Sequence, residues 1–359
     1  MNIMFINTKS KHGGVVSWYI TVMKGLIKRG HCVFLVTTKP INAFNSVVGL
    51  KLYQFPSAAD FDPVVIYRLI VIIKKHKISH IIANTKKEVS LGALAALLTK
   101  SKLIRTIGNY TDLNDSTINR VLMNYFIHNT ITPCKAIITQ AKKAYPALKL
   151  KNYNVIYNGV PIQEYSLEEL QNVRTSWNLQ TDAFIFGMNV QLVNTKGIFD
   201  VLKALSLLQS EHSNAHLVIA GEGYLKEEII NSAKGLEIED KVHLAGFVSN
   251  PQQYAAAYDV CVLASYDEGF PIAMVEYMAA GKAIIVTTAG GITEIVQSGY
   301  NGLLFTPGDI EALYQDMLIL IKNKELRDSL GRAAIQTVKE SFTEQLMLDK
   351  VEELLYELS

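Results

Sequence analysis

Short apolar runs alternate with longer amphipathic runs along most of this 359-residue chain. Runs such as 2–7 and 260–264 are short and almost wholly apolar, which is typical of strands buried on both faces of a sheet. Runs such as 63–75 carry apolar residues at three- and four-residue intervals, which is typical of amphipathic helices. Alternating units of this kind predict parallel, doubly wound α/β sheets. The length suggests two such domains.

The segment 158–161, Asn-Gly-Val-Pro, interrupts the alternation and predicts a linker. We therefore expect one domain over residues 1–158 and a second over residues 159–342. The remaining segment, 343–359, reads as an amphipathic helix that crosses back to the first domain. The expected strands are 2–7, 31–38, 79–83, 103–107, 136–139 and 154–157, then 184–187, 216–220, 242–245, 260–264, 283–287 and 303–305.

The charge is divided unequally along the chain. Residues 1–158 carry 22 Lys and Arg against 5 Asp and Glu, whereas residues 159–359 carry 13 against 28. Either attraction between two oppositely charged halves or an anionic partner of the first half, such as a membrane surface, would explain this division. The sequence shows no zinc-finger spacing and no basic heptads, so we do not expect nucleic acid as a partner.

Cysteine usage and hydropathy indicate a cytoplasmic protein. The three cysteines, Cys32, Cys134 and Cys261, are widely spaced, and the sequence contains no metal-ligand spacing. No apolar stretch is long enough to span a bilayer, and the first residues lack the features of a signal peptide. We leave open a peripheral position on the inner face of the cell membrane.

Two glutamates eight residues apart, Glu268 and Glu276, give the strongest indication of a binding site. Glu268 follows the expected strand 260–264, and Pro271 is suited to the first turn of the helix that we expect directly after Glu268. Both carboxylates then lie at the carboxyl edge of a parallel sheet, where doubly wound folds bind ligands. The helix start can bind phosphate, and the carboxylates can accept hydrogen bonds from several hydroxyls. This is the chemistry of a sugar nucleotide.

The segment 268–276 resembles the paired-glutamate signature of the retaining glycosyltransferases of family GT4, which have the GT-B fold. The likeness covers most of the second half of the chain and is thinner in the first. It implies two Rossmann-like domains facing each other across a cleft, the first for the acceptor and the second for the donor. Further segments that resemble the family are 13–14, 155–160, 196–197, 221–223, 289–296 and 299–309.

The resemblance also implies roles for single residues. Glu268 contacts the hydroxyls of the donor sugar, and Glu276 holds the ribose. Lys196 contacts the diphosphate and stabilises the leaving group, so Glu268 and Lys196 are the expected catalytic residues. The other expected donor contacts are Gly13, Gly14, Gln191, Glu222, Gly269, Phe270, Pro271, Ile272, Gly290 and Gly291.

Two positions depart from the family pattern. An arginine usually precedes the lysine, but this chain has Gln191 there, which can donate hydrogen bonds but carries no charge. A histidine usually follows a first-domain strand, but the corresponding run is 105–110, where Asn109 can bind a sugar hydroxyl and cannot titrate. We expect Asn109 and His12 near the acceptor, although an ordinary surface position is the simpler interpretation of His12.

The leading interpretation is a metal-independent hexosyltransferase that uses a nucleotide sugar, most simply a UDP-sugar, and requires no further cofactor. The basic first half favours a lipid-linked saccharide acceptor in bacterial surface polysaccharide or glycan synthesis. A nucleotide-sugar epimerase and a non-catalytic nucleotide-sugar-binding protein remain open. A dinucleotide oxidoreductase is disfavoured, because the first unit lacks a glycine fingerprint with a downstream ribose-binding acid.

Overall fold

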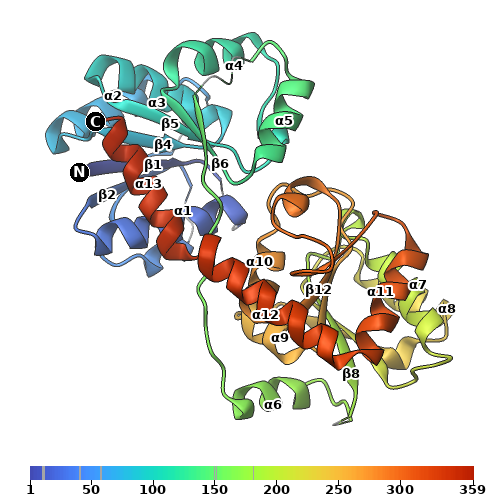
Figure 1. Ribbon diagram of the computed structural model, residues 1–359. Helices are drawn as coiled ribbons and strands as arrows, with labels where there is room; N and C mark the ends of the chain where they lie inside the picture. Colours follow the sequence, from blue (N-terminus) through green and yellow to red (C-terminus); the bar gives the residue numbers. More distant parts are fainter. Residues whose placement is uncertain (10–12, 40–41, 57–58, 149, 151, 181) are drawn as a thin grey trace. The chain divides into compact units, whose positions relative to one another are not determined.

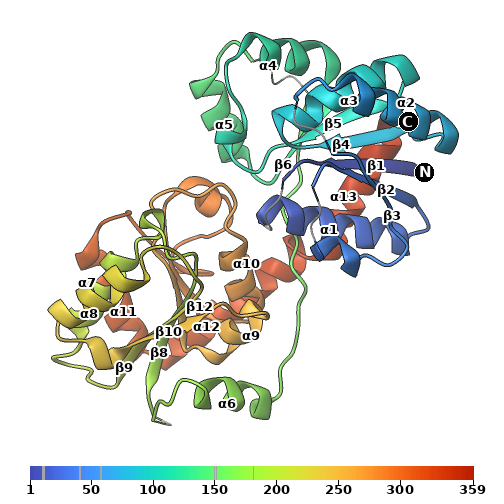
Figure 2. The same ribbon diagram turned by 180° about the vertical axis from the view of Figure 1, so that it is seen from behind.

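The structure is a computed structural model that describes all residues except 10–12, 40–41, 57–58, 149, 151 and 181. The described chain forms two compact units, one of Met1–Asn158 with Glu344–Ser359 and the other of Gly159–Thr343. Each unit is a parallel sheet covered by helices (Figures 1 and 2). The predicted α/β class with two doubly wound sheets is therefore confirmed.

The first unit contains a seven-stranded sheet in the order β3-β2-β1-β4-β5-β6-β7. The order reverses direction between β1 and β4, which creates a topological switch point at their carboxyl ends. The strands are β1 (Asn2–Asn7), β2 (Cys32–Thr37), β3 (Lys51–Gln54), β4 (His80–Ala83), β5 (Lys102–Thr106), β6 (Asn129–Thr132) and β7 (Tyr153–Val155).

Helices cover both faces of this sheet, because successive strand residues point to opposite sides. Ile3 and Phe5 of β1 pack against α1 (Gly14–Lys28) and α13 (Glu344–Glu357). Met4 and Ile6 pack against α2 (Pro63–His76) and α3 (Lys86–Thr99) on the other face. The short helix α4 (Thr117–Val121) continues into a π-helical turn, Leu122–Phe126, that adjoins α3.

The C-terminal helix α13 is held on the first unit by close packing and by ion pairs. A Cβ atom added at Gly25 of α1 would lie 2.3 Å from Cδ1 of Leu348, so glycine permits the two helices to approach. Arg29 pairs with Asp349 at 2.6 Å and with Glu352 at 2.7 Å. These contacts join the last segment of the chain to its first helix.

The second unit contains a six-stranded sheet in the order β10-β9-β8-β11-β12-β13, with its switch point between β8 and β11. The strands are β8 (Phe184–Asn189), β9 (Ala215–Ala220), β10 (Val242–Gly246), β11 (Val260–Leu263), β12 (Ala283–Thr287) and β13 (Leu303–Phe305). The helices are α6 (Leu167–Thr175), α7 (Ile198–Leu208), α8 (Lys226–Gly235), α9 (Pro251–Ala257), α10 (Ile272–Ala279), α11 (Ile310–Lys322) and α12 (Lys324–Ser341).

One predicted strand is wrong. Residues 136–139 lie in the helix α5 (Lys135–Ala144), which buries Ile137, Ile138 and Ala141 on one side. The strand at this place is β6, which the sequence analysis missed. Its Asn129, Thr130 and Thr132 are buried polar residues and only Ile131 is apolar, so no apolar run marks it. The edge strand β3 was missed for a similar reason, since it buries none of its side chains fully.

Candidate functional site

The carboxyl ends of β8 and β11 bring Lys196 and Glu268 together. Lys196 ends a short 3-10 turn after β8, and Glu268 lies in the loop after β11. The Nζ atom of Lys196 donates to Oε1 of Glu268 at 2.6 Å, and Oγ of Ser265 donates to the same oxygen at 2.7 Å. The side chain of Lys196 is 21% exposed and that of Glu268 is 11% exposed, so this pair at the switch point remains accessible to solvent.

Neighbouring contacts fix the geometry of this pair. The main-chain N–H of Tyr266 donates to the carbonyl oxygen of Thr195 at 2.8 Å, which joins the two loops directly. The Tyr266 hydroxyl donates to Asp200 at 2.6 Å, and this bond raises the pKa of Tyr266 to about 12. Gly197 has a φ of +62°, and a Cβ there would lie 2.0 Å from the carbonyl oxygen of Ala264. Only glycine fits this position.

The glycine pair after β12 packs against the loop that carries Glu268. The N–H of Gly291 donates to the carbonyl oxygen of Gly269 at 3.0 Å. Gly290 has a φ of +54°, and a Cβ there would lie 1.6 Å from the carbonyl oxygen of Glu268. Any other residue at Gly290 would displace Glu268. Three of the predicted donor contacts therefore lie directly beside the Lys196–Glu268 pair.

Glu276 occupies a different environment, in the middle of α10. Burial raises the pKa of its carboxyl group to about 7. Among the described residues, no side chain or main-chain group donates a hydrogen bond to this carboxylate, and no cation pairs with it. It is therefore a partly buried acid with unused capacity to accept hydrogen bonds.

The segment between the two glutamates leads into α10. Phe270 is buried, Pro271 directly precedes the helix, and Ile272 is the first helical residue. The first N–H groups of an α-helix have no acceptor within the helix, so they can bind an anion at this point. Pro271 thus stands one position earlier than the first helical turn in which the sequence analysis placed it.

Gln191 and Glu222 lie on adjacent loops after β8 and β9. Both residues are exposed, and the carbonyl oxygen of Glu222 accepts the N–H of Leu192 at 3.0 Å. Gly221 has a φ of +145°, and a Cβ there would lie 1.9 Å from the carbonyl oxygen of Val190. The contact is between main chains, and the two side chains stay available to a ligand.

The predicted positions in the first unit are described only in part. Gly13 caps α1 and Gly14 begins it, and none of the described atoms lies within 4 Å of a Cβ added at either. Among the residues that the structure describes, none packs against either glycine. The side-chain oxygen of Asn109 accepts hydrogen bonds from the N–H and the hydroxyl of Thr111, both at 3.0 Å, so it caps a local turn. His12 lies outside the described residues.

Two buried charged residues of the first unit were missed by the sequence analysis. One oxygen of Glu88 accepts from the N–H of Thr8 at 2.7 Å, and the other accepts from the N–H of Asn84 at 2.7 Å, so Glu88 joins the loops after β1 and β4. Arg105 is fully buried and donates to Asn119 at 2.8 Å, and burial lowers its pKa to about 10. The sequence Thr-x-x-Glu at 85–88 signals a helix start, but it does not signal the contact with Thr8.

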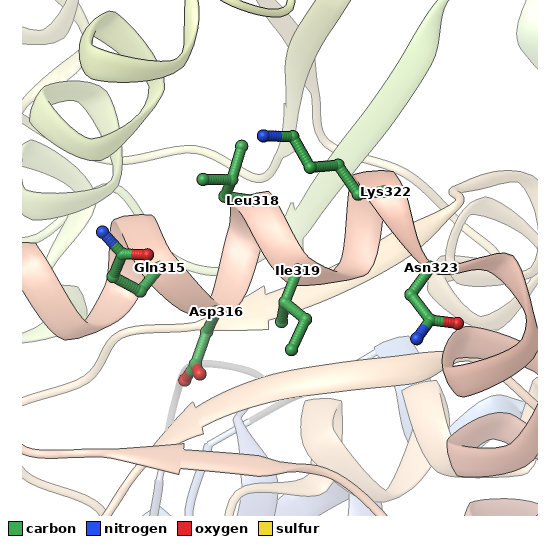
Figure 3. Close-up of a pocket in the computed structure, with 6 residues that line it drawn as sticks. All are labelled: Gln315, Asp316, Leu318, Ile319, Lys322 and Asn323. Atoms are coloured by element: carbon green, nitrogen blue, oxygen red, sulfur yellow. The ribbon is translucent and has the colours of Figure 1, made fainter.

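A hollow of about 590 Å³ along α11 offers a second location in the same unit. Figure 3 shows Asp316 and Ile319 on one side of the helix, and Leu318 and Lys322 on the other. Burial raises the pKa of Asp316 to about 6. Of the residues predicted to bind a ligand, none lines this hollow. We therefore place the candidate site at the carboxyl ends of β8, β11 and β12.

Residues 171–337, which contain this site, match the protein family described as glycosyl transferases group 1. The match covers under half of the chain, so it shows a likeness to that family over this part of the sequence. It is 24% identical over 371 residues to the capsular polysaccharide biosynthesis glycosyltransferase CapM of Staphylococcus aureus, with 97% of both chains covered. It is 26% identical over 251 residues to the N-acetylgalactosamine-N,N'-diacetylbacillosaminyl-diphospho-undecaprenol 4-alpha-N-acetylgalactosaminyltransferase of Campylobacter jejuni, with 65% of this chain and 66% of the other covered.

A solved structure gives the same fold. The chain of Anabaena Alr3699/HepE in complex with UDP is 22% identical, with a TM-score of 0.85 over 99% of this chain and 100% of that one. This likeness supports the predicted GT-B class for the two doubly wound sheets. The chain therefore resembles the group 1 glycosyl transferases in sequence over residues 171–337, and it resembles the Anabaena structure in fold.

Proposed function

We propose that the chain is a retaining, metal-independent glycosyltransferase that moves a sugar from a nucleotide sugar to an acceptor hydroxyl. The observation that carries the proposal is the Lys196–Glu268 pair, which lies beside the Gly290–Gly291 loop at a switch point within the matched family region. A UDP-sugar is the donor we propose, because the Anabaena structure was solved with UDP.

Each donor group has a complementary partner in the proposed complex. The diphosphate contacts Lys196 and the N–H groups at the start of α10. Glu276 accepts hydrogen bonds from the ribose hydroxyls, since its partly buried carboxylate has no donor among the described residues. Glu268 accepts hydrogen bonds from the transferred sugar after Lys196 turns toward the diphosphate. Gln191 and Glu222 contribute neutral and acidic contacts at the adjacent loops.

The proposed reaction breaks the bond between the anomeric carbon and the oxygen of the β-phosphate, and the electron pair stays on that oxygen. Lys196 stabilises the negative charge that develops there. The acceptor hydroxyl forms its bond to the anomeric carbon on the same face and passes its proton to the departing phosphate. The anomeric configuration is then retained, and no protein nucleophile, metal or further cofactor takes part.

The acceptor we propose is a lipid-linked saccharide used in bacterial surface polysaccharide or glycan synthesis. The names of the two relatives support this choice, because one acts in capsular polysaccharide biosynthesis and the other on a diphospho-undecaprenol saccharide. Asn109 and His12 remain our predicted acceptor contacts. A cytoplasmic location follows from the nucleotide-sugar donor in this proposal.

Thermal unfolding with a panel of nucleotide sugars tests the donor assignment. A donor present at about 100 times its Kd should stabilise the protein by about 2.7 kcal/mol. Lys196→Ala should weaken donor binding about tenfold or more, because a charge-assisted contact is lost. Lys203→Ala, at an exposed lysine of the neighbouring helix α7, is the matched control and should leave binding unchanged. The proposal fails if no nucleotide sugar stabilises the chain, or if the two variants behave alike.

The reaction itself is tested by incubating the selected donor with lipid-linked saccharides and examining the product by NMR. Retention at the anomeric carbon is the expected result, and an inverted product would contradict the mechanism. A change in donor stereochemistry without any acceptor would instead identify an epimerase. Full activity in the presence of a metal chelator is expected, and loss of activity that added metal restores would refute metal independence.

A further inference from the structure

The helices on one face of the first unit expose many apolar side chains. They recur at intervals of three and four residues, so each helix turns an apolar stripe toward solvent. α2 and α3 pack side by side, and α3 contacts the turn that follows α4 (Figure 1). We name this surface the α2–α4 face, and its exposed apolar residues are Val64, Tyr67, Val71, Leu94, Leu97, Leu98, Ile118, Val121 and Tyr125.

A hollow of about 300 Å³ opens within the α2–α4 face, between α3 and α4. Thr117 is the only polar side chain among the described residues that line it. The other lining residues are Phe61, Ala93, Leu94, Ile118, Val121, Leu122 and Phe126. Such a hollow suits a flexible hydrocarbon chain and offers little to a polar ligand.

The α2–α4 face is bordered by basic residues. Arg68, Lys74 and Lys75 are exposed on α2, and Lys100 is exposed at the end of α3. The acidic residues nearby are already engaged, since Asp60 pairs with Lys86 and Asp115 pairs with Arg120. The first unit as a whole carries 23 Lys and Arg against 10 Asp and Glu. A partner of this face should therefore be both apolar and anionic.

We infer that the α2–α4 face binds the surface of an anionic lipid bilayer. Leu97 and Leu98 enter the acyl layer, an acyl chain occupies the hollow, and the basic residues meet the headgroups. Among the described helices, none has the length and hydropathy to cross a bilayer. The inference deepens the proposed function, because it states how the chain reaches a lipid-linked acceptor.

A second copy of the chain fits this face less well than a membrane does. A symmetric dimer through the α2–α4 face would bring the same lysines and arginines against each other, and like charges in contact are unfavourable. The bilayer instead supplies negative headgroups beside an apolar layer. The combination of charge and hydropathy therefore favours the lipid surface.

Vesicle flotation of the full chain tests the inference. The protein should float with vesicles of phosphatidylcholine and phosphatidylglycerol and should stay at the bottom with phosphatidylcholine alone. The double variant Leu97→Glu, Leu98→Glu should reduce binding to the anionic vesicles about tenfold or more, because two apolar contacts become two negative charges. Leu207→Glu, at a leucine of comparable exposure on α7 in the other unit, is the matched control and should float like the wild type.

A second measurement reports the depth of insertion. The tryptophan introduced by Leu97→Trp should be quenched by brominated acyl chains, whereas the tryptophan introduced by Leu207→Trp should not. The inference is overturned if wild-type protein does not bind anionic vesicles at low salt, if Leu97→Glu, Leu98→Glu floats normally, or if that variant instead dissolves a dimer seen by gel filtration. Thermal stabilisation by the donor, measured on the same samples, reports separately on the proposed function.

Discussion

Glu276→Gln should stabilise the ligand-free protein at neutral and alkaline pH and should lower its affinity for the donor. Burial raises the pKa of Glu276 from 4.5 to about 7, so the folded state keeps a proton that the unfolded chain has lost between these pH values. Folding stability therefore falls as pH rises through this window and is constant above it. Glutamine has nearly the same size and never ionises, so the variant avoids this loss.

The size of the effect follows from the shift. A difference of 2.5 pKa units corresponds to about 3.4 kcal/mol as an upper limit. The carboxyl group keeps some exposure, so we expect about 1–3 kcal/mol at pH 8 and almost no difference near pH 4.5. For a domain of this size, that corresponds to roughly 2–10 °C in Tm.

Thermal and urea unfolding of both proteins between pH 5 and pH 8 measure this difference. Glu325→Gln, at an exposed glutamate in the first turn of α12, serves as the control and should show no trend between pH 5.5 and pH 8. The reasoning is refuted if Glu276→Gln is less stable than wild type at pH 8, or if their difference is the same at all pH values. The affinity of the variant for the donor should be lower by about tenfold or more, because hydrogen bonds to a carboxylate are lost. The donor should therefore raise the melting temperature of the variant less than that of the wild type.

Gly290→Ala should destabilise the protein by about 2 kcal/mol or more, since it combines a positive φ with a clash against main chain, and it should weaken donor binding. Gly299 also has a positive φ, but a Cβ there would meet open space, so Gly299→Ala is the control. A larger loss of stability for Gly290→Ala than for Gly299→Ala in thermal unfolding measures the contribution of the clash. Gly25→Val should cost about 1–3 kcal/mol, and Leu348→Ala should restore part of it, with hydrogen exchange reporting whether α13 loosens. Burial lowers the pKa of His216 to about 4, so the unfolded chain binds a proton first and stability should fall as pH drops from 6.5 to 4, whereas His216→Gln should flatten that profile.

The apolar strands could be predicted because a strand that is buried on both faces of a parallel sheet has a continuous run of apolar residues. β11 and β12 are buried along their whole length and read as continuous apolar runs. β6 is equally buried, although three of its four side chains are polar. Its main chain pairs with β5 and β7, and this pairing does not depend on whether the side chains are polar or apolar. The sequence therefore does not show whether the strand lies at 129–132 or at 136–139. The apolar residues of α5 led to the wrong prediction of a strand at 136–139.

The location of the candidate site could be predicted from the sequence, but only some of its contacts could. A residue that follows a buried strand must lie at the carboxyl edge of the sheet, so both Lys196 and Glu268 could be assigned to that edge. Their direct contact could not, because it depends on the loop geometry set by Tyr266 and Gly197. The role of Glu88 was hidden for the same reason, since its partner Thr8 is eighty residues away.

The two glutamates of one motif occupy opposite environments, and this contrast argues for one kind of ligand. Glu268 already has a cation at 2.6 Å, whereas Glu276 is partly buried and has no donor among the described residues. An inorganic anion could draw Lys196 away, but it would leave Glu276 without a donor and Glu268 with only the Ser265 hydroxyl. A simple sugar would donate hydrogen bonds to a carboxylate but would offer no negative charge to Lys196. A diphosphate that carries hydroxyl-bearing groups on both sides supplies the anion and both sets of donors together. Binding of UDP alone should therefore be weaker than binding of the complete donor, and the difference should vanish in Glu268→Gln but persist in Glu276→Gln, as calorimetric titration of the three proteins would show.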